Sequence, residues 1–332
     1  MTMFFTEVKP DSIEPKITHA ERIWTIGSCF SDEIGRRMAA DLFNVRVNPC
    51  GTLYNPASIA RMLTRIIDGE PYSKTDVFEH NGLWHCMDFH SSFSGIERAE
   101  VLDRINNLID TLHSEIKTLD RLIITFGSAR MFVDRQTGNV AGNCHKLPTS
   151  RFEVRDMSVE EIAGLYANIF NRLETLNPQL NIILTVSPIR HKAYGFHADK
   201  LSKATLLIAE DMICRATGAA YFPSYEIMDD ELRDYRFYAA DMIHPSPVAC
   251  DHIYSGFLQS ACTPATITLG QQCRKLSLRM SHRPVGPDKG AYDSFIGETA
   301  RLAKEMLQRH PELSDTINAS IGQFISNNQQ QQ

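Results

Sequence analysis

A serine hydroxyl and a distant Asp–His pair are the residues of this sequence best suited to chemistry. Ser28 stands in a Gly-Ser turn after the apolar run 23–26, where several hydrolases expose a nucleophile. Asp241 and His244 are three positions apart, so one helical turn places both side chains on the same face. Histidine can take the hydroxyl proton while a carboxylate orients the imidazole. The three residues therefore predict acyl transfer, with Ser28 as nucleophile, His244 as base and Asp241 as orienting group.

Other interpretations of these residues stay open. Gly-Ser turns mostly connect elements, and an Asp-x-x-His pair can simply be solvated. Cys29 is an alternative nucleophile because thiols are intrinsically better ones. Adjacent residues on a sharp turn point different ways, however, and we expect Cys29 to be buried.

Two further clusters could bind ligands. Asp88 and His90 share one face of a predicted strand and could chelate zinc, but we expect them to line a polar cleft with no metal. The same two alternatives hold for the histidines His80, His85, His145 and His191. The aromatic segment 221–238 could form a sugar platform, although such density more often reflects packing.

Composition indicates a soluble globular protein. Of 332 residues, 43% are hydrophobic and 22% charged, and the net charge is −6 without basic clusters, so nucleic acid and anionic membranes are not expected partners. No run approaches the roughly 18 apolar residues of a membrane span, and the start does not resemble a signal peptide. Eight scattered cysteines without a C-x-x-C motif favour free thiols in the cytoplasm.

The elements that must position the candidate residues alternate between strands and helices. Apolar runs predict strands at 22–26, 45–47, 122–126, 181–186 and 220–222. Helices are predicted at 31–42, 56–67, 97–117, 158–176, 201–217 and 246–260, and hairpins around Asn81-Gly82 and 137–139. This alternation predicts a parallel sheet between helices. Glycine, serine and polar turns follow four of the strands, so they converge on one rim of the sheet.

Residues 1–262 are expected to form one domain. Residues 263–332 are expected to form a helical extension around the Pro-Gly-rich stretch 283–287. Its helices either pack on the main domain or make a contact between two copies of the chain. The polar tail 327–332 predicts disorder.

The sequence resembles the GSCFA family within the SGNH-hydrolase superfamily. The resemblance covers about residues 20–260, and one motif has serine at Ser31 where the family has alanine. It rests on the stretches 26–31 (IGSCFS), 48–56 (NPCGTLYNP), 143–148 (NCHKLP), 185–191 (TVSPIRH), 221–226 (YFPSYE) and 232–238 (LRDYRFY).

This resemblance implies a flavodoxin-like, three-layer α/β/α sandwich and hydrolysis through an acyl-enzyme by a Ser28-His244-Asp241 triad. It also implies that Gly51 supplies an oxyanion-hole N–H together with that of Ser28. The superfamily has Gly-x-Asn-Asp in its third block, whereas residues 127–130 read Gly-Ser-Ala-Arg. We expect Asn143 to replace the missing side-chain donor, with His191 as second choice.

The sequence thus predicts a bacterial-type esterase without a cofactor. Its expected substrate is a small-molecule ester or an ester carried by a carbohydrate. The substrate-cleft candidates are His191, Arg190, His145, Asp88 and His90. The alternative is a non-catalytic or acyltransferase-like domain of the same fold, whose anion- or carbohydrate-binding cleft is formed by Arg190, His191, Lys146 and Arg233.

Overall fold

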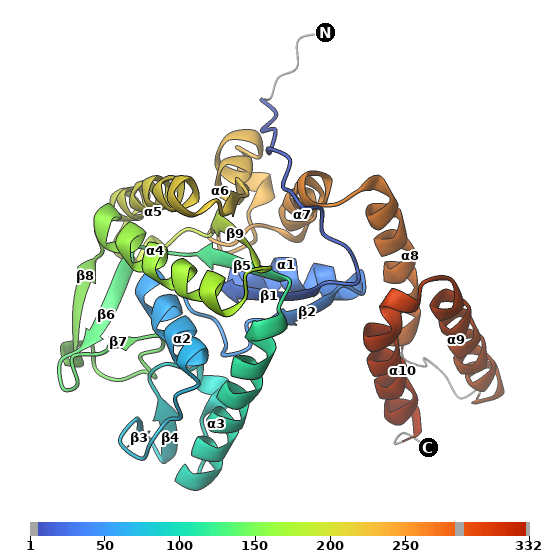
Figure 1. Ribbon diagram of the computed structural model, residues 1–332, viewed down its shortest axis with the longest axis horizontal. Helices are drawn as coiled ribbons and strands as arrows, with labels where there is room; N and C mark the ends of the chain where they lie inside the picture. Colours follow the sequence, from blue (N-terminus) through green and yellow to red (C-terminus); the bar gives the residue numbers. More distant parts are fainter. Residues whose placement is uncertain (1–5, 283–288, 330–332) are drawn as a thin grey trace.

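The computed structural model describes residues 6–282 and 289–329. Its centre is a five-stranded sheet of order β10-β9-β5-β1-β2, in which every neighbouring pair is parallel (Figure 1). The strands are β1 (Arg22–Gly27), β2 (Asn44–Val47), β5 (Arg121–Phe126), β9 (Asn181–Val186) and β10 (Ala220–Tyr221). The predicted parallel sheet is confirmed.

Helices cover both faces of this sheet, which gives an α/β architecture consistent with an α/β/α sandwich. Trp24 and Ile26 pack toward α2, α3, α4 and α5, whereas Ile23 packs on the opposite side with α1 and α7. Successive strand residues point to opposite faces, so both faces need apolar side chains. The helices are α1 (Cys29–Ala40), α2 (Pro56–Asp68), α3 (Arg98–Glu115), α4 (Val159–Leu176), α5 (Phe196–Thr217) and α7 (Pro247–Ala261).

Local capping residues explain several of the helix boundaries. The Ser158 side chain accepts a hydrogen bond from Glu161 N at the start of α4, and the Glu161 carboxylate accepts one from Ser158 N, which confirms the predicted capping box. Asn55 caps α2 ahead of Pro56, and Gly69 ends that helix in the left-handed conformation.

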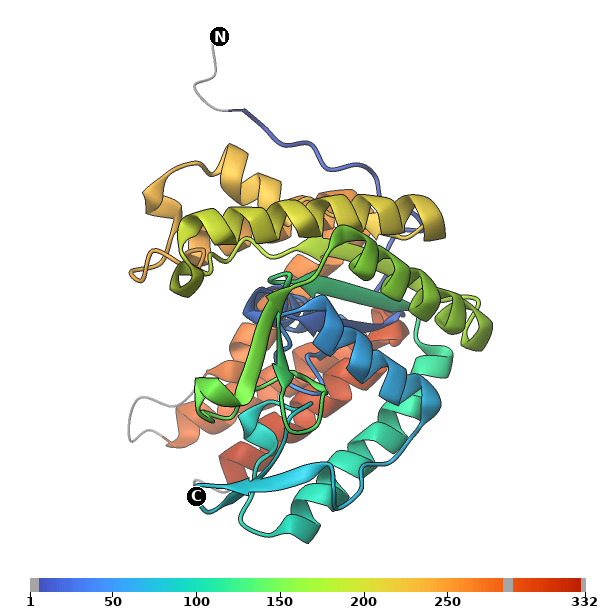
Figure 2. The same cartoon turned by 90° about the vertical axis from the view of Figure 1, so that its left-hand side faces the viewer.

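Two small sheets stand at the end of the molecule away from the C-terminal helices (Figures 1 and 2). β3 (Val77–His80) and β4 (Leu83–Cys86) form the predicted hairpin. β6 (Arg130–Asp134) pairs with β7 (Val140–Ala141) and with β8 (Phe152–Asp156), a strand that was not predicted. β4 ends at Cys86 because Phe89 N bonds back to the Cys86 carbonyl in a turn. The prediction that Asp88 and His90 lie on that strand is therefore wrong.

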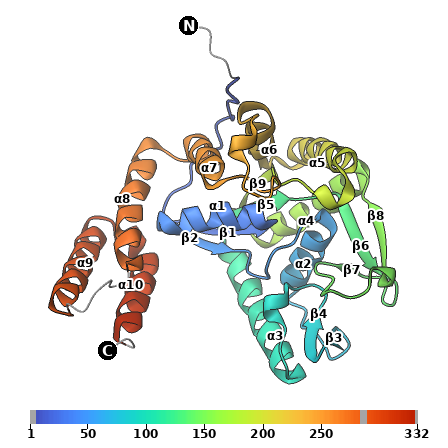
Figure 3. The same ribbon diagram turned by 180° about the vertical axis from the view of Figure 1, so that it is seen from behind.

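Three helices form a separate layer beyond the edge of β2 and α1 (Figure 3). They are α8 (Pro264–Ser281), α9 (Lys289–Arg309) and α10 (Ser314–Gln329), and they share a small apolar core that includes Leu42. Arg274 also binds the buried carboxylate of Asp41, at 2.6 and 2.9 Å. This ion pair joins the layer to the sheet domain.

The sequence expectations for the end of the chain meet the structure only in part. Residues 327–329 belong to α10, so the prediction that the polar tail is disordered from residue 327 is wrong for these three. These three residues are Asn327, Asn328 and Gln329, and the helix continues through them although asparagine is a weak helix former. Residues 330–332, like the predicted Pro-Gly-rich stretch 283–287, lie outside the described residues.

The strand order also determines where a site can form. From β1 the chain continues to β2 on one side, and β5 then joins the other side of β1. Ligands of such sheets bind beyond the carboxyl ends of the strands at this reversal. Gly27 is in register with Thr125 there, so the turns after β1 and β5 adjoin. Of the helices in the described ranges, none combines the length and apolar character that a membrane crossing requires.

Candidate active site

Ser28 caps α1. Its hydroxyl accepts a hydrogen bond from Phe30 N at 3.3 Å, and its side chain and backbone are only 1% exposed. Ser28 N donates to the Thr125 carbonyl, so the residue is fixed between β5 and the first turn of α1. A serine in this position satisfies an N–H group that the helix itself leaves without a partner.

Cys29 is the first residue of α1 and is half-buried. Its Sγ lies 3.6 Å from Nε2 of His244, and the other ring nitrogen of His244 lies 2.6 Å from Oδ2 of Asp241. The close contact with Asp241 places the imidazole proton on Nδ1, so Nε2 is free to accept a proton from the thiol. Cys29, His244 and Asp241 therefore form a connected series of thiol, imidazole and carboxylate.

The Asp241–His244 contact is made by a tight loop. The sequence prediction that these residues share a helical turn is wrong, because Met242 adopts a positive φ of 59° that interrupts any helix. Asp241 Oδ1 accepts hydrogen bonds from the backbone N–H groups of Ile243 and His244, at 2.9 and 3.0 Å. The carboxylate thus holds both the backbone and the side chain of His244.

The structure differs from the expected contact between Ser28 and His244. Within the described residues no hydrogen bond joins the two, and the sulfur of Cys29 occupies the place expected for the Ser28 hydroxyl. The physical reason is the start of α1. Once Ser28 turns inward as the cap, the next side chain is the one that faces the loop before α7, which carries His244. The nucleophilic role of Ser28 is not supported by this geometry.

The candidate oxyanion donors differ in whether their polar groups already have hydrogen-bond partners within the protein. Gly51 has a φ of 83°, and a Cβ there would lie 2.1 Å from that of His90, so only glycine fits. Its N–H donates to the Asn48 carbonyl at 2.8 Å and is already engaged in a turn. Asn143 uses its side-chain oxygen to accept from His145 N. By contrast, the Cys29 N–H has only the sulfur of its own side chain as a hydrogen-bond partner among the described residues, and it sits at the positive end of the α1 dipole.

The residues of this candidate site lie within the range of a known protein family. The model of the GSCFA family matches residues 22–257. The chain belongs to the GSCFA family. The matched range begins with β1 and includes Cys29, Asp241 and His244, so the whole candidate triad lies in the part that defines the family.

Other comparisons add little to this family assignment. No curated protein matches the sequence significantly. One solved structure aligns with 74% of this GSCFA chain and 100% of its own, at 11% sequence identity and a TM-score of 0.38. A likeness at that level carries no argument about fold or activity.

The charges around the GSCFA triad favour a neutral thiol at rest. Burial raises the pKa of the Cys29 thiol, and the nearby acids Asp32 and Glu33 raise it further. The pKa of Asp241 is lowered to about 2 by the hydrogen bonds it receives, first from the backbone and side chain of His244. Cys29 therefore needs His244 to remove its proton, and Asp241 stays ionised to support the imidazolium that results.

Three residues that were expected to line the substrate cleft are engaged with partners within the protein. Asp88 is buried and accepts from Arg61 at 2.8 Å and from the Tyr72 hydroxyl at 3.0 Å. His145 is buried with Nε2 2.8 Å from the Cys86 carbonyl, and burial lowers its pKa to about 4. His90 faces Gly51 and caps a short turn. Nowhere in the described ranges do three or more His, Cys, Asp or Glu side chains gather as a metal site.

His191 and Arg190 lie closer to the triad of the GSCFA protein. His191 Nε2 is 3.2 Å from the Gly127 carbonyl, and burial, followed by the charge of Lys203, lowers the His191 pKa to about 4. Arg190 N donates to the Ile243 carbonyl, and its guanidinium donates to that of Met242. His191 is thus a neutral wall of the site, and Arg190 supports the loop that carries His244.

Two positioning residues were missed by the sequence analysis. Lys203 is fully buried on α5 and donates to the carbonyls of Gly127 and Ser187 at 2.6 and 2.7 Å, which ties together the ends of β5 and β9. Asn48 accepts from Gly27 N and donates to Asp32. Lys203 could have been recognised in the sequence as a lysine on the apolar face of α5. The role of Asn48 could not, because it depends on contacts between distant turns.

Proposed function

We propose that this GSCFA protein is a hydrolase that cleaves ester bonds through an acyl intermediate on Cys29, with His244 as general base and Asp241 as its orienting group. The observation that carries the proposal is the Cys29 Sγ to His244 Nε2 distance of 3.6 Å, combined with the 2.6 Å contact from His244 to Asp241. A nucleophile in contact with a base that is itself oriented by a third group is the arrangement that covalent catalysis requires.

The chemical steps follow from the protonation states. As Cys29 Sγ bonds to the substrate acyl carbon, its proton moves to Nε2 of His244. The imidazolium then gives this proton to the departing alkoxide oxygen as the carbon–oxygen bond breaks, leaving a thioester on Cys29. Water next attacks the thioester carbon while Nε2 accepts a water proton, and that proton returns to the sulfur when the acid is released.

The start of α1 supports charge stabilisation in these steps. The Cys29 N–H lies at the N-terminus of a twelve-residue helix with no partner among the described residues besides its own sulfur, so it is suited to meet a developing oxyanion. Gly51 would add its N–H only by sharing it with the Asn48 carbonyl. We therefore assign the first oxyanion contact to Cys29 and a secondary one to Gly51.

The sheet order and the positions of the triad residues also support a relationship to the SGNH-hydrolase superfamily. The nucleophile candidate follows the first strand, and the Asp-x-x-His loop precedes the last helix of the sandwich. In this proposal a thiol stands where that superfamily uses a serine hydroxyl. All eight cysteines are unpaired, which favours action in a reducing compartment such as the cytoplasm.

Hydrolysis of p-nitrophenyl acetate by variants tests the proposal. We expect Cys29→Ala and His244→Ala to lose the activity and Ser28→Ala to keep it. Activity that survives in Cys29→Ala but is lost in Ser28→Ala would place the nucleophile on the serine. A wild-type protein that hydrolyses neither this ester nor an acetyl thioester would contradict the hydrolase proposal itself.

A further inference from the structure

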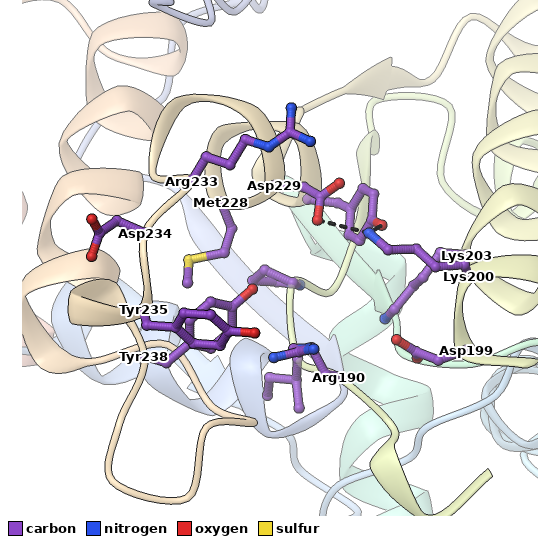
Figure 4. Close-up of a pocket in the computed structure, with 13 residues that line it drawn as sticks. Arg190, Asp199, Lys200, Lys203, Met228, Asp229, Arg233, Asp234, Tyr235 and Tyr238 are labelled. Carbon is purple, nitrogen blue, oxygen red and sulfur yellow. Dashed lines mark hydrogen bonds and ion pairs between the residues drawn. The ribbon is translucent and has the colours of Figure 1, made fainter. Parts of the chain in front are cut away.

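A cavity of about 320 Å³ opens beside the loop that carries His244 (Figure 4). It lies between the start of α5 and the segment 225–238, and neither Cys29 nor His244 lines it. In Figure 4 Arg190 and Arg233 lie across the cavity from each other, with tyrosines on one side and lysines on another. The cavity is therefore distinct from the triad but shares Arg190 with its supporting loop.

The acidic side chains around this cavity already have partners. Asp229 pairs with Lys200 at 2.7 Å, and Asp234 pairs with Arg236, which lies outside the cavity. Asp199 accepts a hydrogen bond from His191 N. No acid of the lining is left without a positive or N–H partner.

The positive side chains are in excess. Arg233 lines the cavity and has no hydrogen-bond or ion-pair partner among the described residues. Arg190 gives one hydrogen bond to a backbone carbonyl and no bond to a carboxylate there. Arginine presents a planar set of donors that matches the oxygens of a phosphate or carboxylate. The unpaired charge therefore favours an anionic ligand.

Aromatic rings supply the other half of the lining. The Arg190 guanidinium lies over the rings of Phe196 and Tyr238, at 4.2 and 5.2 Å from their centroids, which fixes its direction. Tyr235 is largely exposed beside Tyr238, with 6.1 Å between the two ring centroids. Rings with hydroxyl groups offer an apolar face and a hydrogen-bonding edge together, a combination that suits a sugar ring.

We propose that this cavity binds a sugar that carries a phosphate or a carboxylate group, and that this sugar is the part of the substrate to which the acyl group is attached. The second half of the statement rests on the proposed function. Arg190 connects the two sites, because it holds the carbonyls of Met242 and Ile243 directly before His244. A sugar bound at Arg190 and Arg233 is thereby recognised next to the loop that carries the base.

Calorimetric titration of the full-length protein tests the binding site. The probes are glucose 1-phosphate and glucuronate, with neutral glucose and inorganic phosphate as comparisons. We expect at least one anionic sugar to bind more tightly than both comparisons, and Arg233→Gln to weaken that binding about tenfold or more. Arg215→Gln is the matched control, since it removes the same charge from an exposed position on α5 outside the cavity and should leave the affinity unchanged.

The results of these titrations either support or overturn the proposed sugar site. Failure of both anionic sugars to bind, equal binding of inorganic phosphate, or an affinity that Arg233→Gln leaves unchanged would overturn it. Cys29→Ala should bind the sugar as the wild type does, because Cys29 is not part of the cavity. Sugar binding without ester hydrolysis would thus refute the proposed activity, and with it the link between the sugar and an acyl group, but not the binding site. Ester hydrolysis without sugar binding would refute the role of the cavity alone.

Discussion

Replacing Ser28 with alanine separates a structural role from a chemical one. The hydroxyl accepts a single hydrogen bond from Phe30 N, and 3.3 Å is at the long end of the usual range. Losing a serine cap costs about 0.5–2 kcal/mol, so we expect Ser28→Ala to lower the free energy of unfolding by about 1 kcal/mol. For a chain of this size that corresponds to a fall of about 1–3 °C in the melting temperature.

The assay for Ser28→Ala pairs thermal melting with ester hydrolysis below the melting temperature. Ser158→Ala is the matched control, because Ser158 caps α4 and lies on the surface away from the triad. Both variants should lose similar stability and keep the wild-type rate within about twofold. If Ser28→Ala melts like the control but hydrolyses the ester a hundredfold more slowly, the reasoning that its hydroxyl serves only as a cap is refuted.

Three other predictions follow from the same contacts. Asp241→Asn should slow ester hydrolysis by about two or more powers of ten, because the imidazole of His244 loses the carboxylate that orients it and supports its charge; an unchanged rate would remove Asp241 from the triad. Because the pKa of Cys29 is raised, the fraction of its thiolate form grows only at alkaline pH. The rate at which iodoacetamide alkylates Cys29 should therefore still rise with pH where the alkylation rate of a free cysteine has become constant. A rate for Cys29 that becomes constant near neutral pH would contradict this. Arg274→Gln should destabilise the fold by about 3 kcal/mol in urea unfolding, since it leaves the buried Asp41 carboxylate without its cation, while hydrolysis below the transition persists; a loss under about 0.5 kcal/mol would show that the pair does not hold the C-terminal helices.

The fold was predictable where local sequence and global packing agree. Apolar runs such as 181–186 became buried strands, and Ser158 with Glu161 marked a helix start that the structure confirms. The strand β8 was missed although Phe152 and Val154 alternate with charged residues, because this alternation is short and only Phe152 is buried. The last residues of α10 were misjudged because neither the polar composition nor the weak helix propensity of Asn327 and Asn328 indicates that the preceding helix continues through them.

The residues of the candidate site could be predicted from the sequence better than the contacts between them. The pairing of Asp241 with His244 followed from their spacing, although a loop with a positive φ at Met242 makes it instead of a helix. Whether Ser28 or Cys29 faces His244 depends on which of the two side chains caps α1. The three-dimensional path of the backbone decides this, and the sequence alone does not.

Arg190 and Arg233 were expected from the sequence to share one cleft, and both line the cavity, whereas His191 and Lys146, expected beside them, do not. Which cations of the lining lack an acidic partner depends on contacts between residues 188–203 and 225–238, and no local pattern reveals these contacts.

The proposed catalysis requires that the sulfur of Cys29 carries the acyl group. The most direct measurement is peptide mapping by mass spectrometry after the protein is mixed with p-nitrophenyl acetate and rapidly quenched in acid. We expect one acetyl group on Cys29 that is absent in Cys29→Ala and strongly reduced in His244→Ala. An acetyl group on Ser28, or acetylation of Cys29 that is unaffected by His244→Ala, would contradict it.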